Sequence, residues 1–218
     1  MWGEVMRARW ASVVFSGAAA LMLAGCMQQG QLAPSSDAGW TARDRQQLTN
    51  PPYAQVSIPQ EYQRQIVTYN RREAPGTVVV DTRNRYLYYV MGKGQALRYG
   101  VTVGEEGQSW SGVAKVGRKT EWPSWTPTPG EKQRLGNLPD YVAPGAQNPM
   151  GSRALYLYDG GRDTQYRIHG TNQPEYIGRA ISSGCIRMTN EDVIDLYNRV
   201  KVGATVVVLP ANSSWSML

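Results

Sequence analysis

Residues 76–90 read GTVVVDTRNRYLYYV, two runs of β-branched and aromatic residues separated by a polar turn. Such runs favour strands, and a polar turn between them is typical of a hairpin. The next segment, GKGQALRYGVTVG at 92–104, adds a turn and another strand. It lacks the G-x-G-x-x-G spacing and the following helix of a dinucleotide-binding loop, so it does not indicate that function. This part of the chain predicts a mostly β fold.

Further strands and one helix are predicted towards the C-terminus. The strands are RALYLYD at 153–159, TQYRIH at 164–169 and ATVVVLP at 204–210. The helix is TNEDVIDLYNRV at 189–200, with Thr189 as N-cap, Asp192 three residues later and Gly203 beyond its end. The whole pattern predicts a β-sandwich or barrel of about seven to nine strands with one late helix.

The composition narrows the class of protein. A hydrophobic content of 41% permits a packed core, and the formal net charge of +6 suits an anionic wall or membrane surface. Thirteen Tyr and seven Trp against one Phe supply amphipathic rings for wet grooves and β-structure. Lys/Arg-rich runs of the kind that mark nucleic-acid binding are absent from the sequence, so we expect no nucleic-acid partner.

The only histidine, His169, and one of the two cysteines, Cys185, bound one segment, HGTNQPEYIGRAISSGC. A strand–loop–strand excursion of this length can bring its two ends together. The imidazole could then activate the thiol, either as a base or as an ion-pair partner that lowers an ordinary thiol pKa of about 8.5. The tight SSGC turn suits an oxyanion hole, because Gly184 permits close backbone approach.

Two other interpretations remain open at this point. Free cysteine is among the most buried residue types, so taken alone Cys185 is more simply a packing residue and His169 a satisfied polar one. A strong metal site needs three or four ligands, and one His with one available Cys leaves only carboxylates to complete it. We therefore expect no metal.

The longer stretch HGTNQPEYIGRAISSGCIRM at 169–188 resembles the active-site signature of the L,D-transpeptidase catalytic domain (YkuD) family. That family frames its site with a His-Gly and a downstream Ser-x-Gly-Cys-x-Arg, which correspond here to His169-Gly170 and residues 182–187. The resemblance covers roughly residues 75 to 210. Many members have His where this chain has Ser183. The resemblance implies a β-sandwich-like catalytic domain whose cysteine lies in a groove covered by a loop.

The resemblance also implies a reaction on peptidoglycan stem peptides, with no cofactor. Cys185 thiolate would attack the carbonyl of the third stem residue, a diamino acid, and release the terminal D-alanine. His169 would give a proton to the leaving amine and later take one from the acceptor. The Gly170 carbonyl would orient the imidazole, and backbone N–H groups near Gly184 and Cys185 would stabilise the oxyanion.

Several residues near the pair are candidates for binding substrate. Arg187 could hold a stem carboxylate with its guanidinium fork. Ser182 and Ser183 could donate hydrogen bonds to substrate or only shape the turn. Trp122, in EWPSWTPTP at 121–129, could line the groove or clamp its loop.

The acyl acceptor stays open. It could be another stem, which gives a 3-3 crosslink, an amine on an outer-membrane protein, which gives a covalent anchor, or water, which makes the protein an L,D-carboxypeptidase. A non-catalytic wall-binding lipoprotein is another alternative, but such a protein would not need the His-Cys-Arg set. Cysteine amidases place Cys before His in the chain, the reverse of the order here, and a sortase-like strand motif around Cys185 is missing.

The N-terminal sequence predicts where in the cell the protein is located. Arg7 and Arg9 precede an apolar run shorter than the ~20 residues that span a bilayer. The run ends in Leu-Ala-Gly-Cys26, which resembles a bacterial lipobox; an ordinary signal with a stray cysteine is the alternative. We expect a signal peptide at 1–25 and a lipid on Cys26 that holds the protein in the periplasm. Met27 rather than Asp after the cysteine favours the outer membrane.

The predicted domain boundaries follow from changes in amino-acid composition along the chain. Residues 26–74 are rich in Gln, Ser, Pro and Asn, which predicts a flexible tether with a short helix near its end at 59–73. The catalytic domain is predicted at 75–210 and a C-terminal tail at 211–218.

Overall fold

The computed structural model describes residues 31–32, 39–105 and 110–212. The predicted signal peptide, Cys26 and residues 213–218 of the predicted tail lie outside these ranges. Within them, none of the helices has both the length and the apolar character needed to cross a membrane.

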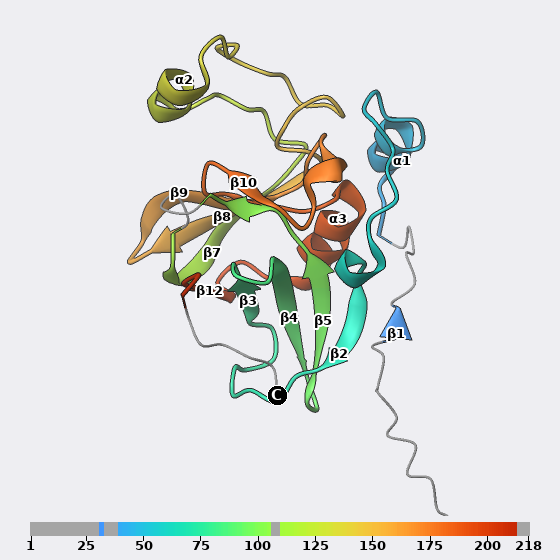
Figure 1. Cartoon of the computed structure of the whole chain (residues 1–218), viewed down its shortest axis with the longest axis vertical. Coiled ribbons are helices and arrows are strands. Elements are labelled where there is room, and N and C mark those ends of the chain that lie inside the picture. The colour runs from blue at the N-terminus through green and yellow to red at the C-terminus, as the bar shows by residue number, and fades with distance from the viewer. Residues whose placement is uncertain (1–30, 33–38, 106–109, 213–218) are drawn as a thin grey trace, which may run out of the picture.

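The domain is built on a curved ten-stranded sheet (Figure 1). In spatial order its strands are β1 (Gln31–Leu32), β2 (Gln65–Thr68), β5 (Gln95–Gly100), β4 (Tyr86–Gly92), β3 (Val78–Asp81), β12 (Thr205–Leu209), β7 (Gly112–Glu121), β8 (Arg153–Asp159), β9 (Arg162–His169) and β11 (Ile186–Arg187). The central strand β12 runs parallel to β3 and antiparallel to β7, and so joins the two halves. A second sheet pairs β6 (Val103–Gly104) with β10 (Ala180–Ser182) in parallel.

The mostly β prediction is confirmed. The predicted hairpin at 76–90 is the antiparallel pair β3–β4, with Val80 opposite Leu87. The other predicted strands correspond to β8, β9 and β12. The ten-residue strand β7 was not predicted, because its sequence GVAKVGRKTE is rich in Gly and Lys, which are depleted in strands.

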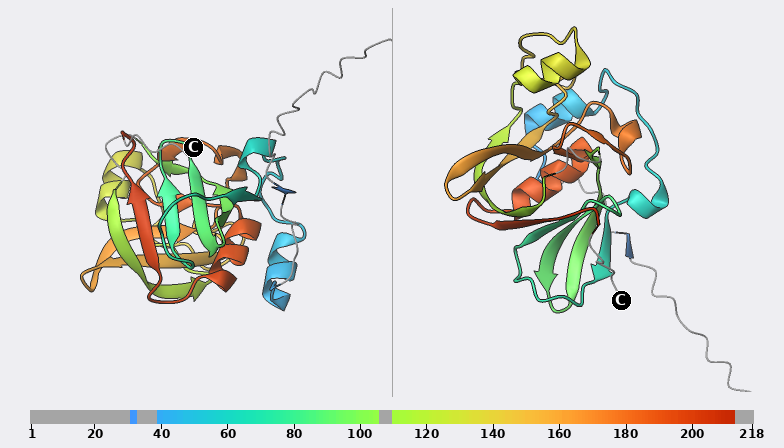
Figure 2. Two further views of the ribbon diagram at one scale, coloured as in Figure 1. Left: turned by 90° about the horizontal axis from the view of Figure 1, so that it is seen from below. Right: turned by 60° about the vertical axis from the view of Figure 1, so that its left-hand side comes forward.

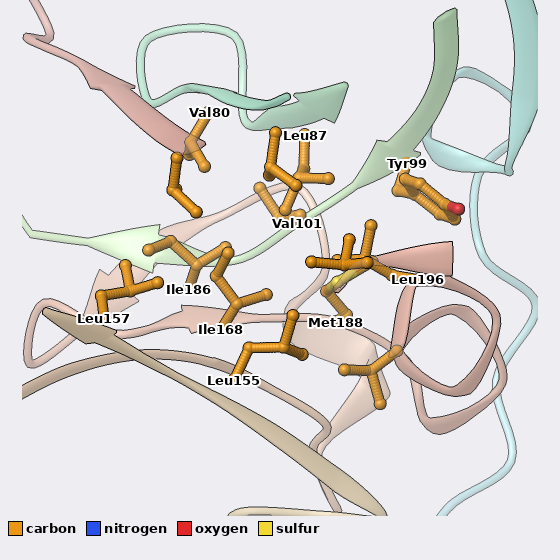
Figure 3. Close-up of a cluster of buried hydrophobic side chains, with 14 of the residues drawn as sticks. Val80, Leu87, Tyr99, Val101, Leu155, Leu157, Ile168, Ile186, Met188 and Leu196 are labelled. Carbon is orange, nitrogen blue, oxygen red and sulfur yellow. The ribbon is translucent and has the colours of Figure 1, made fainter. Parts of the chain in front are cut away.

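The core lies inside the curve of the sheet, where its two halves face each other (Figures 1 and 2). Val80 and Leu87 from the first half face Leu157 and Ile168 from the second, as Figure 3 shows, and all four are fully buried. Helix α3 (Asn190–Arg199) closes the open side with Leu196 and neighbouring apolar residues. This is the expected β-sandwich-like domain.

The helix predicted at 189–200 is confirmed as α3. Its N-cap is Thr189, whose hydroxyl oxygen accepts from the backbone N–H of Asp192 at 3.2 Å. Two helices were not predicted, α1 (Ala42–Leu48) and α2 (Pro129–Leu135). Each begins at a capping box, Thr41 with Asp44 and Thr128 with Glu131, and these pairs were the available sequence signal.

Within the predicted tether at 26–74, the residues described from 39 onwards carry defined elements that pack on the domain. The three-residue 3₁₀ turn Gln60–Tyr62 replaces the short helix expected at 59–73, and β2 then pairs antiparallel with β5. Helix α1 is tied to the domain by Asp44, which is fully buried and binds Arg153 through both oxygens, at 2.8 and 2.6 Å. Burial alone would raise the pKa of Asp44, but its hydrogen bonds with Arg153 and Thr41 leave that pKa below its ordinary value.

We expect Asp44→Ala to lower the free energy of unfolding by about 3–5 kcal/mol, because it leaves the Arg153 guanidinium buried without its counter-charge. Urea unfolding of both chains measures the difference. The matched control is Asp159→Ala, at an exposed acid at the end of β8, which should stay within about 0.5 kcal/mol of the parent. Equal stability of the Asp44→Ala and parent chains would mean that α1 is not docked.

Candidate active site

His169 and Arg187 face each other at the end of the second half of the sheet. Strand β9 ends at His169, and β11 pairs with it in parallel so that Arg187 is opposite His169. On the other side of β9, Tyr156 of β8 is opposite Arg167. Because side chains alternate along a strand and Ile168 points into the core, Arg167 and His169 share the outer face.

Cys185 lies one residue before β11 and is half-buried. Its sulfur contacts the backbone of Arg167, two residues before His169, so thiol and imidazole occupy diagonal positions on neighbouring strands. The charge of Arg187 acts on both groups. The structure therefore brings the ends of the predicted His–Cys segment to one place.

The imidazole of His169 is held by the backbone carbonyl that the family resemblance suggested. Its Nδ1 lies 2.7 Å from the Gly170 carbonyl oxygen, and since a carbonyl can only accept, we assign the proton to Nδ1. The lone pair of Nε2 is then available to act as a base. Gly170 has no room for a side chain, because a Cβ there would lie 2.3 Å from Oδ1 of Asn190.

The surroundings of the pair favour the neutral form of both side chains. Burial, aided by the charge of Arg187, lowers the pKa of His169 to about 3, although hydrogen bonds with the backbone of Gly170 and Met150 oppose the shift. Burial also raises the pKa of the Cys185 thiol above its ordinary value, against the hydrogen bond from the Arg167 backbone. These shifts favour a neutral thiol and a neutral imidazole over a preformed ion pair.

We expect the rate of Cys185 alkylation by iodoacetamide to rise continuously with pH and to keep rising above pH ~8.5, the ordinary thiol pKa. The measurement uses a chain with Cys26→Ser, in which Cys185 is the only thiol. A plateau of high reactivity between about pH 5 and 8 would instead identify a thiolate–imidazolium pair.

Ser182 shapes the turn before the nucleophile. It is 1% exposed, its hydroxyl donates to the Cys185 carbonyl at 2.6 Å, and the same oxygen accepts from the Gly184 N–H at 3.1 Å. Of the two roles predicted for Ser182, the structure supports turn formation. It does not support substrate binding, because the hydroxyl is buried and already hydrogen-bonded within the turn. Gly184 has φ of +116°, a conformation that side-chain-bearing residues rarely adopt.

The oxyanion prediction changes accordingly. The N–H of Gly184 is already engaged by Ser182, whereas the N–H of Cys185 has no acceptor among the residues that the structure describes. The free backbone donor is therefore that of Cys185 itself.

Arg187 is placed as a binding residue would be. Its side chain has no hydrogen-bond or ion-pair partner in the described ranges, so the alternative of a surface salt bridge is not supported. Burial lowers its pKa, against the influence of Cys185 and Glu131, but the group remains a cation at neutral pH. A half-buried guanidinium without a partner is suited to a carboxylate.

A loop excursion between β7 and β8 carries α2, which projects from the sheet (Figure 1). Nη2 of Arg134, on α2, donates to the hydroxyl of Ser183. The charge of Glu131 acts on both Cys185 and Arg187. Ser183 is thus a contact between the turn and this loop. The charges that α2 brings to the site were not predicted, because residues 129–135 are about 50 positions from Cys185 in the sequence.

Trp122 does not line the site. It is 3% exposed, packs with Leu48 and Ile194, and donates its indole N–H to Asp44 at 2.9 Å. The prediction of substrate binding by Trp122 is therefore replaced by a packing role beneath α1.

A group of metal-ligating side chains is absent from the site as far as the structure describes it. In the described ranges, three or more His, Cys, Asp or Glu side chains do not gather where they could hold a metal ion. A cavity of about 680 Å³ lies elsewhere, between the N-terminal segment and the start of α3, with Tyr53, Arg64 and Asp192 in its wall. Its lining does not include Cys185 or His169.

Comparisons with known proteins identify the family of this chain. The family model of the L,D-transpeptidase catalytic domain (YkuD) matches residues 75–208. The probable L,D-transpeptidase ErfK/SrfK of Escherichia coli is 34% identical over 179 residues, which cover 74% of this chain and 54% of that one. The probable L,D-transpeptidase YbiS of Escherichia coli is 38% identical over 139 residues, 60% of this chain and 43% of that one. The chain thus spans about half the length of these relatives.

Two solved structures are also similar. One, described as a probable carnitine operon oxidoreductase from Brucella melitensis, is 46% identical with a TM-score of 0.47, over 70% of this chain and 96% of that one. The catalytic domain of the E. faecium L,D-transpeptidase is 22% identical with a TM-score of 0.45, over 66% and 97%. Because the family model spans more than half of the sequence, this chain belongs to the L,D-transpeptidase catalytic domain (YkuD) family.

Proposed function

We propose that the protein is a peptidoglycan L,D-transpeptidase that works through an acyl-enzyme on Cys185. The observation that carries the proposal is the placement of Cys185 and Arg187 beside a neutral imidazole whose Nδ1 is held by the Gly170 carbonyl. A thiol, a base oriented by a third group and an unpaired guanidinium are what acyl transfer from a carboxylate-bearing peptide requires.

The first half-reaction transfers the acyl group to the protein. Nε2 of His169 takes the thiol proton as sulfur attacks the carbonyl of the third stem residue, and the N–H of Cys185 donates to the oxyanion. The intermediate collapses with cleavage of the C–N bond, and His169 returns the proton to the departing D-alanine amine. Arg187 holds a stem carboxylate during the attack.

The second half-reaction releases the acyl group. His169 takes a proton from an incoming amine as its nitrogen attacks the thioester, and the thiol leaves with that proton. An amine of another stem gives a 3-3 crosslink, and an amine of an outer-membrane protein gives a covalent attachment. Attack by water would make the protein an L,D-carboxypeptidase.

Mass spectrometry of products from a purified disaccharide-tetrapeptide tests the proposal. Loss of D-alanine together with a crosslinked dimer supports transpeptidation to a stem. Loss of D-alanine without a dimer supports hydrolysis, or a protein acceptor that must then be added to the assay. A chain that leaves the tetrapeptide unchanged and forms no thioester would contradict the proposal and favour a non-catalytic wall-binding lipoprotein.

We further propose that a signal peptide at 1–25 is removed and that a lipid on Cys26 holds the protein at the outer membrane, facing the periplasm. The support is the basic, apolar and Leu-Ala-Gly-Cys sequence of residues 1–26. Metabolic labelling with a fatty acid should mark the protein, and Cys26→Ala should abolish the label. A labelled Cys26→Ala chain would contradict this assignment.

A further inference from the structure

A row of side chains crosses the outer face of the sheet from Cys185 towards β7. Arg167 on β9 lies next to Cys185, Tyr156 on β8 is opposite Arg167, and Arg118 on β7 is opposite Tyr156. The central carbon of the Arg118 guanidinium is 3.6 Å from the centre of the Tyr156 ring, and that of Arg167 is 4.4 Å from it. Both lie within the ~6 Å range of a cation–π contact.

The two arginines differ in charge compensation. Arg167 forms a two-point pair with Asp163, at 2.7 and 2.9 Å. Arg118 is exposed and has no carboxylate partner in the part of the chain that the structure describes. Its one hydrogen bond, to the hydroxyl of Thr120, is long at 3.4 Å. Arg118 is therefore an uncompensated cation at the end of the row.

Stacking on Tyr156 prepares the Arg118 guanidinium for an anion. A stacked guanidinium is held through its face, which leaves the N–H donors at its edge free to form a fork with a carboxylate. Because the ring already restricts the side chain, less rotamer freedom is lost when a ligand binds. A free surface lysine would offer neither the fork nor the restriction.

The length of the row suits a short peptide. Three strand spacings of ~4.8 Å separate the backbone at Cys185 from that at Arg118, about 14 Å in all. An extended peptide covers this distance with about four residues. A stem peptide whose carbonyl reacts at Cys185 can therefore lie across the strands and reach Arg118.

We propose that Arg118 forms a carboxylate subsite for the stem peptide, with Tyr156 as its support and Arg167 as the link to the nucleophile. The proposal rests on the proposed function, since it takes the ligand to be a stem peptide. Each stem carries a free carboxylate remote from its reacting atom: beside the side-chain amine of the diamino acid in the donor, and at the terminal D-alanine in the acceptor. The chemistry recognised by Arg118 is the same in either case.

Calorimetric binding to full-length protein carrying Cys185→Ala tests the subsite without any turnover. The probes are the tetrapeptide as free acid, the same peptide amidated at its terminal D-alanine, and the peptide amidated beside its side-chain amine. We expect Arg118→Gln to weaken binding of the free acid about three- to tenfold. One of the two amidated peptides lacks the carboxylate that Arg118 binds, and Arg118→Gln should not weaken its binding. The difference between the free acid and this amide therefore isolates the contact between Arg118 and that carboxylate.

The pattern of loss identifies the stem. Insensitivity of the terminally amidated peptide to Arg118→Gln assigns the subsite to the acceptor, whose terminal carboxylate is remote from its attacking amine. Insensitivity of the other amide assigns it to the donor, whose side-chain carboxylate is remote from the reacting carbonyl. Arg118→Lys should fall between parent and Arg118→Gln, because it keeps the charge and loses the stacked fork. Equal affinity of parent and Arg118→Gln for the free acid overturns the proposal.

Lys115→Gln is the matched control. Lys115 lies on the same strand and loses the same charge, but its ammonium donates to the Thr205 hydroxyl at 2.8 Å, towards β12 and away from the row. The Lys115→Gln protein should bind all three peptides with the affinity of the parent. If Lys115→Gln weakens binding as much as Arg118→Gln, the effect is a general loss of positive charge and the subsite is rejected. Because turnover of the parent chain is measured separately, failure of the subsite and failure of the proposed function give different results.

Discussion

Cys185→Ala should abolish formation of the acyl-enzyme and release of D-alanine while the fold stays intact. The substitution removes the thiol of the one cysteine in the described ranges, and its side chain is half-buried beside β9 rather than part of the main core. Intact-mass measurement of the protein after incubation with tetrapeptide should show the thioester in the parent and no mass shift in the variant.

The competing packing hypothesis predicts a different result for the same variant. A cysteine that served only the core would cost about 1–3 kcal/mol of stability on truncation and leave turnover in place. Circular dichroism and urea unfolding of Cys185→Ala therefore belong with the activity assay. An unfolded variant, or a folded variant that still releases D-alanine, would remove Cys185 from its proposed role.

His169→Gln should slow acylation by about 10²–10⁴-fold, because the thiol would lose the base that accepts its proton. Glutamine keeps a polar side chain of similar reach, so the carbonyl of Gly170 retains a donor. Single-turnover thioester formation measures the rate. Acylation at the parent rate would show that another group takes the proton.

The buried neutral imidazole also sets the response to acid. With a folded pKa of about 3, His169 stays unprotonated below its ordinary value of 6.5, so the rate of acylation should not fall as pH drops through 6.5. In the unfolded chain the same group is protonated below 6.5, which favours unfolding as pH falls from 6.5 towards 3. The parent should therefore lose more stability than His169→Gln over this interval, as urea unfolding at each pH can measure.

Local patterns predicted the parts of the molecule that depend on nearby residues. Alternation and turn residues indicated the β3–β4 hairpin, and the Thr189 cap indicated α3, because both follow from contacts between neighbours in sequence. The pairing of His169 with Cys185 rested on the family signature. The residues alone left a packing role open.

The features that the sequence analysis missed depend on contacts between residues far apart in the sequence. Asp44 and Arg153 are 109 residues apart, and nothing near Asp44 indicates that a polar segment will bury it. The same docking removes Trp122 from solvent, although its Pro-rich loop suggested a groove. Gly184 was predicted as an oxyanion donor, but its N–H donates to the Ser182 hydroxyl in the folded turn. That hydrogen bond depends on the turn geometry, which the sequence alone does not show.

The N-terminal attachments have a mechanical consequence if Cys26 carries a lipid. Gln31, where β1 pairs with β2, is five positions after Cys26, and five extended residues reach at most ~18 Å. The next described tie along the chain is Gly39, whose carbonyl accepts from the Asn198 side chain at 3.4 Å; without β1 the limit at this position, thirteen after Cys26, would be ~47 Å. The pairing of β1 with β2 therefore decides how far the domain can stand from the membrane surface.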